Sequence, residues 1–309
     1  MKERLLLVLN PVAGGGASTE AVLEVVRQLR EQGHPIDVEA TSEVGQARRI
    51  AASRAADYDR VAACGGDGTI SEVAAGLLDS GAGKPLVVVP AGTANDFAAA
   101  IGAGALPEEA LRLAFEGRLA PLDVGFAGET PFVNAASAGV AAEISEGASA
   151  ELKAAIGPLA YLASGLSRLG SLHGFEGAIE GAEGRYEGPV LFFAVANGQT
   201  VGGGTRVAPE ALVDDGLLDL VILPALPASS LIGALRALRA GTQHPGLVRM
   251  RGERFSMEAD REVTITCDGE PVRSSAIDFH VAPGALSLVV HGPAPARRWS
   301  GEVAQGESR

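Results

Sequence analysis

Cysteine, tryptophan and basic residues are all scarce in this sequence. Its 309 residues include two cysteines and one tryptophan, and 25 Lys and Arg face 38 Asp and Glu. Cys64 and Cys267 stand far apart in apolar segments without ligand-like spacing, which predicts two buried free thiols. The net charge of −13 argues against a nucleic-acid partner, because nucleic-acid binders displace counterions from phosphates with positive charge.

Long apolar runs are also missing. No stretch approaches the roughly 18 apolar residues of a membrane-spanning helix. The run Leu5–Leu9 stops at Asn10-Pro11 and is shorter than the core of a signal peptide, about 7–15 residues, so it indicates a buried strand. The few histidines are scattered, and a zinc site is not expected. We therefore expect a cytoplasmic protein.

Strand and helix patterns alternate over residues 1–126. Strands are predicted at 5–9, which is an all-apolar run, and at 36–40, 60–64 and 86–89. Helical spacing predicts helices at 21–32, 45–54, 69–78 and 95–101, and Asp123-Val124-Gly125 is taken as a turn. Repeated βα units of this kind predict an α/β domain with a parallel, doubly wound sheet.

The pattern becomes strand-rich after that turn. Strands are expected at 132–136, 178–180, 190–196, 217–223, 263–266, 277–281 and 286–290, and helices at 148–169 and 229–240. We expect a β-rich second domain at 127–291. Residues 292–309 are interpreted as a tail that could return to the first domain.

Glycine is abundant, and three of its clusters follow predicted strands. The 41 glycines are roughly twice the usual share. The clusters lie in segments 10–16, 65–69 and 90–96, and strand ends of open α/β sheets are where ligands bind. Glycine lets backbone N–H groups approach a phosphate, and a helix N-terminus adds partial positive charge. Thr69 and Thr93 add hydroxyl donors, and Asp67 could hold magnesium.

A single glycine cluster is more often a tight turn, but three at equivalent strand ends indicate a phosphate site. Neither G-x-x-x-x-G-K-[ST] nor G-x-G-x-x-G occurs, so a different class of phosphate loop is needed. The order NPVAGGG, CGGDGTISEV and VPAGTANDFA resembles the diacylglycerol kinase catalytic-domain family, especially its bacterial soluble lipid kinases. Sphingosine and ceramide kinases are relatives, and NAD kinases are more distant ones. The resemblance continues through Asn197-Gly198, Gly202–Gly204, Ala208-Pro209, 214–219 and 268–270.

The resemblance implies a fold and a cofactor. It implies an N-terminal α/β nucleotide domain, a C-terminal β-rich sandwich-like domain, and an active site in the cleft between them. It also implies ATP with Mg²⁺. The nucleotide contacts carried over are Asn10, Pro11, Gly14, Gly15, Gly16, Thr41, Gly65, Gly66, Asp67, Gly68, Thr69, Glu72, Thr93, Asn95 and Asp96.

The segment Asp268-Gly269-Glu270 carries the catalytic expectation. On its residues alone it is best read as a hairpin turn. Phosphorylation of an alcohol needs a group that accepts the hydroxyl proton. The family's base corresponds to Glu270, and Asp268 is a supporting or competing candidate. Asp67 is the third residue for which we expect a catalytic role.

A second metal expectation concerns Asp214-Asp215-Gly216, which otherwise indicates a turn. By the resemblance, Asp215 would bind magnesium together with the carbonyl groups of Leu212 and Leu217. Asp123 would reach the magnesium of the nucleotide.

One departure from the family stands out. Many relatives have Lys or Arg in or after the first glycine loop, whereas Ala17-Ser18 follow Gly16 here. We therefore expect binding of the triphosphate to depend strongly on magnesium.

Basic residues are concentrated in 231–257. This segment contains Arg236, Arg239, Arg249, Arg251 and Arg254 with only Glu253 opposing them. Basic residues near an anionic leaflet favour binding, so the segment is expected to contact the membrane transiently. The alternative is a solvated helix face next to ordinary loop arginines.

We predict an ATP-dependent kinase of a membrane lipid such as diacylglycerol. One alternative is a kinase of a soluble alcohol, as in the NAD kinases, and another is a non-catalytic nucleotide sensor. The sequence decides neither the lipid nor whether the chain forms a homodimer.

Overall fold

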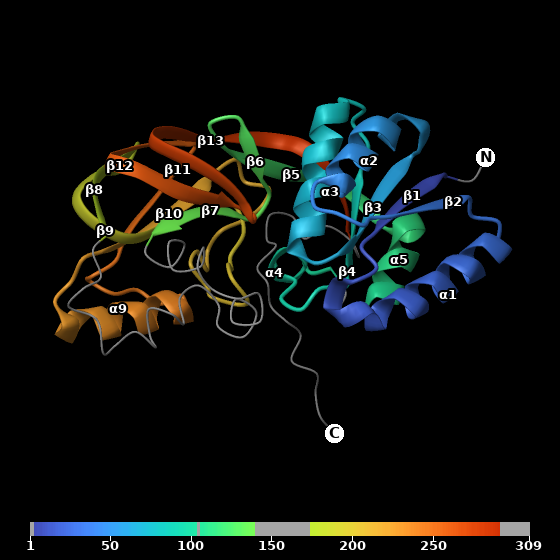
Figure 1. Ribbon diagram of the computed structural model, residues 1–309, viewed down its shortest axis with the longest axis horizontal. Coiled ribbons are helices and arrows are strands. Elements are labelled where there is room, and N and C mark those ends of the chain that lie inside the picture. The colour runs from blue at the N-terminus through green and yellow to red at the C-terminus, as the bar shows by residue number, and fades with distance from the viewer. Residues whose placement is uncertain (1–2, 104–105, 140–173, 291–309) are drawn as a thin grey trace, which may run out of the picture. The chain divides into compact units, whose positions relative to one another are not determined.

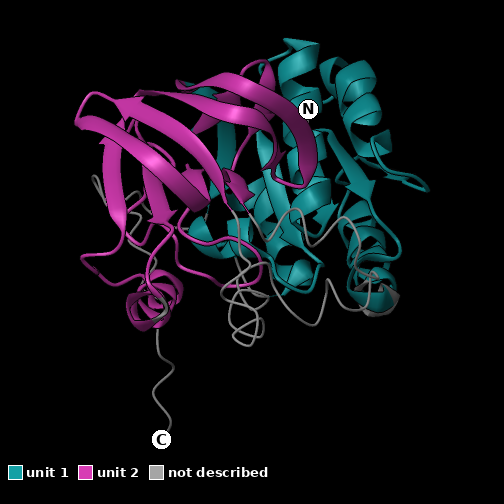
Figure 2. Cartoon of the chain, turned by 60° about the vertical axis from the view of Figure 1, so that its left-hand side comes forward, with its two compact units in different colours: residues 1–122, 284–309 teal, residues 123–283 magenta. Residues whose placement is uncertain are grey.

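The structure is a computed structural model that describes residues 3–103, 106–139 and 174–290. It divides into unit 1, residues 1–122 with 284–309, and unit 2, residues 123–283. Figures 1 and 2 show the elements and the two units. The helix predicted at 148–169 and the tail at 292–309 lie outside the described residues.

Unit 1 is built on a parallel sheet. Its strands are β1 (Leu5–Leu9), β2 (Ile36–Ala40), β3 (Arg60–Gly65) and β4 (Leu86–Pro90), in the order β2-β1-β3-β4. The far end of β13 (Glu270–Val290) adds a parallel bridge from Leu288 to Leu86. All residues of β1 and β4 are buried, as expected for strands covered on both faces.

Helices cover both faces of this sheet (Figure 1). Helices α1 (Ala17–Glu31) and α5 (Pro107–Glu116) pack with Leu5, Leu7 and Leu9 in one core. Helices α2 (Gln46–Arg54) and α3 (Asp67–Ser80) lie together on the other face. They approach closely at Gly76, where a Cβ would overlap the carbonyl of Arg48. The doubly wound prediction is confirmed.

The expected turn at Asp123-Val124-Gly125 is wrong. These residues lie inside β5 (Arg118–Ala127), which pairs with β6 (Thr130–Phe132). Gly125 is needed there because a Cβ would overlap the ring of Phe132. Gly125 therefore allows close packing against Phe132 within a strand and does not form a turn.

Unit 2 is mostly antiparallel sheet, which confirms the β-rich prediction. Its strands include β7 (Ala135–Gly139), β8 (Phe175–Gly181), β9 (Gly184–Ala196), β10 (Leu218–Pro224), β11 (Val248–Gly252) and β12 (Arg254–Cys267). The path runs β11-β10-β9-β7-β12-β13, and β8 pairs with both β9 and β12. Strand β11 was not predicted, and the two strands expected at 277–281 and 286–290 both belong to β13.

Helix α9 (Ala228–Ala240) packs against this sheet (Figure 1). Its buried residues Leu231, Ala234 and Leu238 share a core with Phe192 of β9 and Val221 of β10. The apolar side of α9 is therefore used inside unit 2. Within the described residues, no helix is both long and apolar enough to span a bilayer.

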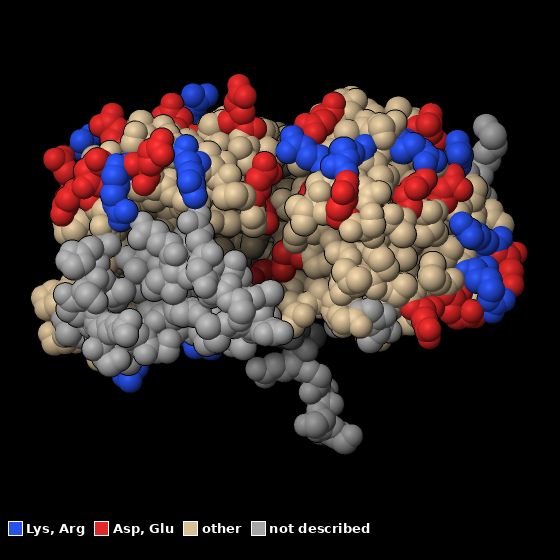
Figure 3. Space-filling view, in the orientation of Figure 1, with Lys and Arg blue, Asp and Glu red and all other residues tan. Residues whose placement is uncertain are grey.

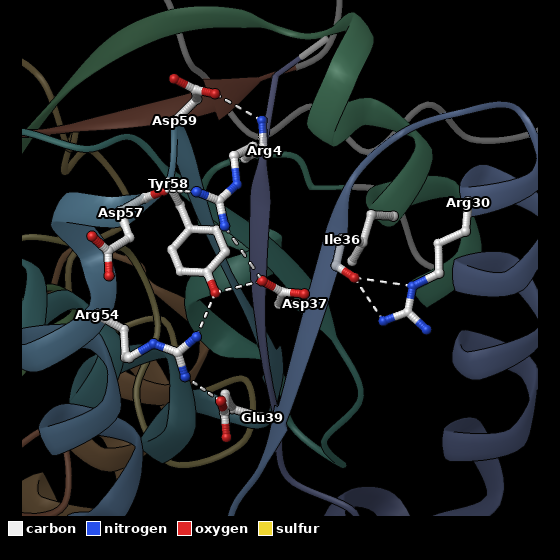
Figure 4. A network of polar contacts seen from close by, with 9 residues as sticks. All are labelled: Arg4, Arg30, Ile36, Asp37, Glu39, Arg54, Asp57, Tyr58 and Asp59. Carbon is white, nitrogen blue, oxygen red and sulfur yellow. Dashed lines mark hydrogen bonds and ion pairs between the residues drawn. The ribbon is translucent and has the colours of Figure 1, made fainter.

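A polar network ties the edge strand β2 into unit 1 (Figure 4). The hydroxyl of Tyr58 donates to Asp37 at 2.6 Å and accepts from Arg54 at 2.6 Å. Arg54 also pairs with Glu39, and the guanidinium of Arg4 lies 4.9 Å from the Tyr58 ring centre. Arg4 and Tyr58 precede β1 and β3, so this network lies near the amino ends of those strands.

Both thiols are predicted to be unreactive in the native protein. Cys64 and Cys267 are free and buried, and burial raises the pKa of each to about 12. Since the thiolate is the reactive form, we expect no labelling by a disulfide reagent at pH 8 and labelling of both after denaturation in guanidinium. Mass spectrometry would count the labelled thiols, and rapid native labelling of either cysteine would contradict the prediction.

Candidate functional site

The carboxyl ends of the strands of unit 1 are aligned at one edge. The amide of Thr41 donates to Leu9 O at 2.8 Å, and the amide of Asn10 donates to Cys64 O at 2.9 Å. The amide of Ala91 donates to Gly65 O at 2.8 Å. The strand order changes direction between β1 and β3, and ligands of open α/β sheets bind outside strand ends at such a point. All three glycine loops therefore meet where a ligand is expected.

These loops touch through their backbones. A Cβ on Gly14 would lie 2.5 Å from the carbonyl oxygen of Ala91, and a Cβ on Gly92 would overlap Gly66 Cα. Gly14 and Gly15 have φ of 56° and 76°, in the left-handed region that glycine adopts without strain. The first loop continues directly into α1 at Ala17. The predicted start at residue 21 was late, so this loop also ends in a helix N-terminus.

Two side chains link the first and second loops. Asn10 Nδ2 donates to Thr69 Oγ1 at 3.2 Å, and Asn10 Oδ1 accepts from the amide of Val12 at 3.2 Å. Thr69 is buried, whereas Gly68 and Thr93 are exposed. The hydroxyl of Thr69 thus contributes to loop structure.

Asp67 joins the second loop to the third. Its carboxylate accepts hydrogen bonds from the amides of Asp96 at 3.1 Å and Phe97 at 2.9 Å, at the start of α4 (Asp96–Ala100). Asn95 closes the same loop by exchanging two 3.0 Å hydrogen bonds with Gly92. Burial is the main cause of a raised pKa for Asp67. The structure therefore places the predicted magnesium ligand in the cap of a helix.

Like Asp67, Glu72 accepts hydrogen bonds from backbone amides at the start of a helix. Its two carboxylate oxygens accept from the amides of Gly45 at 2.8 Å and Ala47 at 3.1 Å. Those amides lie at the N-terminus of α2. Glu72 was expected to contact nucleotide, and here it positions a neighbouring helix.

In unit 2, Asp268 and Gly269 form a two-residue hairpin turn between β12 and β13. Their φ angles of 48° and 103° are both positive, and the flanking pair is Cys267 with Glu270. The sequence also indicated this turn when read without the resemblance. Glu270 is exposed.

The Asp268 carboxylate points back onto the protein. It accepts hydrogen bonds from three successive amides, at 2.6 Å from Val133, 3.1 Å from Asn134 and 2.8 Å from Ala135. The amide of Asp268 in turn donates to Ala135 O at 3.0 Å. Asp268 is therefore the anchor that holds segment 133–135 against the hairpin.

Asp123 is buried and organises the segment around Gly216. Its carboxylate accepts from the amide of Gly216 at 2.6 Å, and its own amide donates to Val213 O at 2.7 Å. Asn197, fully buried, donates to the carbonyl groups of Asp123 at 2.9 Å and Val133 at 2.8 Å. Asn197-Gly198 was part of the family resemblance, but no role was predicted for it. The only signal in the sequence was an Asn-Gly pair in a strand-rich region.

Asp215 has a cationic partner. One carboxylate oxygen pairs with Arg251 and the other accepts from the amide of Leu217 at 3.0 Å. Burial raises the pKa of Asp215, and it raises that of Asp219, a second partner of Arg251, to about 6. Among the described residues, no group of three or more His, Cys, Asp or Glu side chains is arranged to hold a metal.

The structure separates the five predicted membrane arginines. Arg236, Arg239 and Arg254 are exposed. Arg249 donates to Val207 O at 2.6 Å, and Arg251 pairs with the two aspartates. On the face of the molecule in Figure 3, acidic and basic side chains are interspersed.

Comparison with known proteins identifies the two halves. Residues 4–127 match the diacylglycerol kinase catalytic domain, and residues 134–290 match the YegS C-terminal NAD kinase beta sandwich-like domain. The chain belongs to this kinase family. It is therefore an enzyme, and both the family and the two-domain fold expected from the sequence are confirmed.

Relatives match along almost the whole chain. A Pseudomonas putida protein named probable lipid kinase YegS-like is 38% identical over 293 residues, covering 94% of this chain and 96% of the relative. A Cronobacter sakazakii protein of the same name is 39% identical over 286 residues, covering 91% and 93%.

Solved structures share the fold. One is the crystal structure of a diacylglycerol kinase from Bacillus anthracis, with a TM-score of 0.74 at 22% identity, covering 94% of this chain and 97% of that one. A second structure from the same strain has a TM-score of 0.82 at 24% identity, covering 94% and 95%.

The contact between glycine loops predicts that Gly92→Ala is destabilising. The added methyl group would overlap Gly66 and press on Asn95, and overpacking of this kind costs about 1–3 kcal/mol. Thermal unfolding should show a lower Tm. Gly68→Ala is the matched control, because no atom lies within 4 Å of its added Cβ. Equal Tm values for the two variants would contradict the packing argument.

Proposed function

We propose that this kinase transfers the γ-phosphate of MgATP to a hydroxyl group of a membrane lipid such as diacylglycerol. The observation that carries the proposal is the edge of unit 1 where three glycine loops meet through their backbones. The lipid acceptor is supported by relatives named lipid kinases.

The loops would bind the phosphates through backbone N–H groups. Helix α1 begins at Ala17, directly after the first loop, and helix α3 begins at Asp67, within the second loop. Helix N-termini attract anions. Neither Lys nor Arg occurs in the first loop. Much of the triphosphate charge would then be offset by the magnesium that arrives with the nucleotide.

Glu270 would be the general base. It would take the proton of the acceptor hydroxyl as that oxygen attacks the γ-phosphorus and ADP leaves. Asp268 is the weaker candidate because its carboxylate already accepts hydrogen bonds from three amides. It would keep the hairpin, and with it Glu270, in place.

We predict different effects for substitutions of Glu270 and Asp268. Glu270→Gln should lower kcat at least about 100-fold, the scale of general-base catalysis, and leave Tm and MgATP affinity unchanged. Asp268→Asn should lower stability by about 1–3 kcal/mol, because amides lose an acceptor, while asparagine tolerates the positive φ. Radiolabelled ATP, calorimetry and thermal unfolding give the three readouts.

The assay would compare dispersed diacylglycerol, phosphatidylglycerol, ceramide, a sphingoid base and a polyprenol with the soluble acceptors glycerol and NAD. Glu253→Gln, at an exposed glutamate of unit 2, is the matched control and should leave the rate unchanged. Phosphate incorporation only into a soluble acceptor would contradict the lipid proposal. A Glu270→Gln variant with wild-type turnover would contradict the assignment of the base.

We also propose that exposed arginines of unit 2 contact an anionic membrane surface. Arg236 and Arg239 lie on the exposed side of α9, and Arg254 is exposed on β12. Because the apolar side of α9 packs in the core of unit 2, the contact would be electrostatic and sensitive to salt.

Charge reversal tests the membrane contact. Each basic residue near an anionic leaflet contributes about 1 kcal/mol, so Arg236→Glu with Arg239→Glu should weaken binding to phosphatidylglycerol vesicles at least about tenfold. Sedimentation with the vesicles measures the binding. Arg27→Glu with Arg49→Glu, at two exposed arginines of unit 1, is the matched control. Equal loss in both pairs would show that only net charge matters and would refute this surface.

A further inference from the structure

Arg251 of β11 lies between two aspartates of unit 2. It pairs with Asp215, and its Nε lies 3.4 Å from Asp219 Oδ2. Arg251 is directly opposite Asp219 in the register of β10 and β11, and its amide donates to Glu183 at 2.7 Å. The backbone pairing therefore fixes the position from which the Arg251 side chain extends.

We infer that the guanidinium of Arg251 takes the place of a structural divalent cation at Asp215. By the family resemblance, this aspartate would bind magnesium with the carbonyl groups of Leu212 and Leu217. The inference concerns the folding of unit 2 and does not depend on the proposed lipid acceptor.

The residues present do not fit a magnesium ion without rearrangement. Magnesium binds through free carboxylate oxygens in near-octahedral geometry. Here one Asp215 oxygen pairs with Arg251 and the other accepts from the amide of Leu217. A divalent ion bonded to Asp215 would also lie next to a permanent positive charge and be repelled by it.

The guanidinium can hold the same segment that a metal would hold. Asp215 lies in the loop before β10, Asp219 lies within β10, and Arg251 contacts both from β11. Arg249 on the same strand donates to Val207 O. The two arginines therefore offset negative charge at Asp215 and Asp219, while Asp123, Asp214 and Glu210 add negative charge nearby.

The experiment uses the full chain, freed of metal with EDTA and without nucleotide. Electron paramagnetic resonance would count bound Mn²⁺, and thermal unfolding would be recorded in EDTA and in MgCl₂. For the native chain we expect the same Tm in both solutions and the same Mn²⁺ count as for Asp215→Asn. Arg251→Gln should lose several degrees of Tm in EDTA, recover them in MgCl₂ and gain one Mn²⁺. The double variant Arg251→Gln with Asp215→Asn should not bind this additional Mn²⁺.

Arg254→Gln, at an exposed arginine of the neighbouring strand, is the matched control and should change neither readout. Should Arg251→Gln fail to fold, Arg251→Lys retains a positive charge and should remain insensitive to MgCl₂. A Mn²⁺ ion in the native chain that disappears in Asp215→Asn would overturn the inference. An Arg251→Gln variant as stable as the native chain in EDTA would overturn it equally.

Discussion

Direct contact between peptide backbones is the constraint on which the candidate site of unit 1 depends. Gly14 lies against the carbonyl of Ala91, and Gly66 lies against Gly92, with no space for a Cβ at Gly14 or Gly92. Backbone amides can bind a polyphosphate only where side chains do not hold the ligand away. If this edge binds phosphate as proposed, it would rely on peptide dipoles, which agrees with the lack of Lys and Arg in the first loop.

Carboxylates serve as anchors for the backbone throughout the protein. Asp67 accepts from amides of α4, Glu72 from amides of α2, Asp123 from Gly216 and Asp268 from three amides of segment 133–135. Hydrogen bonds to a charged acceptor are stronger than those between neutral groups. The same acidic residues that suggested metal, nucleotide or proton chemistry therefore hold loops and helix ends in place.

The arginines of 231–257 lie in two different environments. Arg236 and Arg239 are exposed on α9, whereas Arg249 and Arg251 contact groups within unit 2. Strand β11 was not predicted because Val248–Gly252 mixes arginines with apolar residues. Its pairing with β10 places Arg251 opposite Asp219, and this register gives the positive charge a structural role.

Local pattern by itself indicated most strands of unit 1, because Leu5–Leu9 and 86–89 are apolar runs ended by asparagine and proline, and 60–64 is followed by glycine. It also indicated which loops follow those strands, and these loops are where we propose that phosphate binds. The helix α5 was missed although Ala110, Leu111 and Ala114 have helical spacing. Asp123-Val124-Gly125 was misread because the need for glycine beside Phe132 arises only when β5 and β6 pair. Tertiary structure alone decided the use of Asp67, Glu72 and Asp268. Their partners are backbone amides distant in the chain. Every residue except proline has such an amide, so the sequence does not reveal which one a carboxylate will contact.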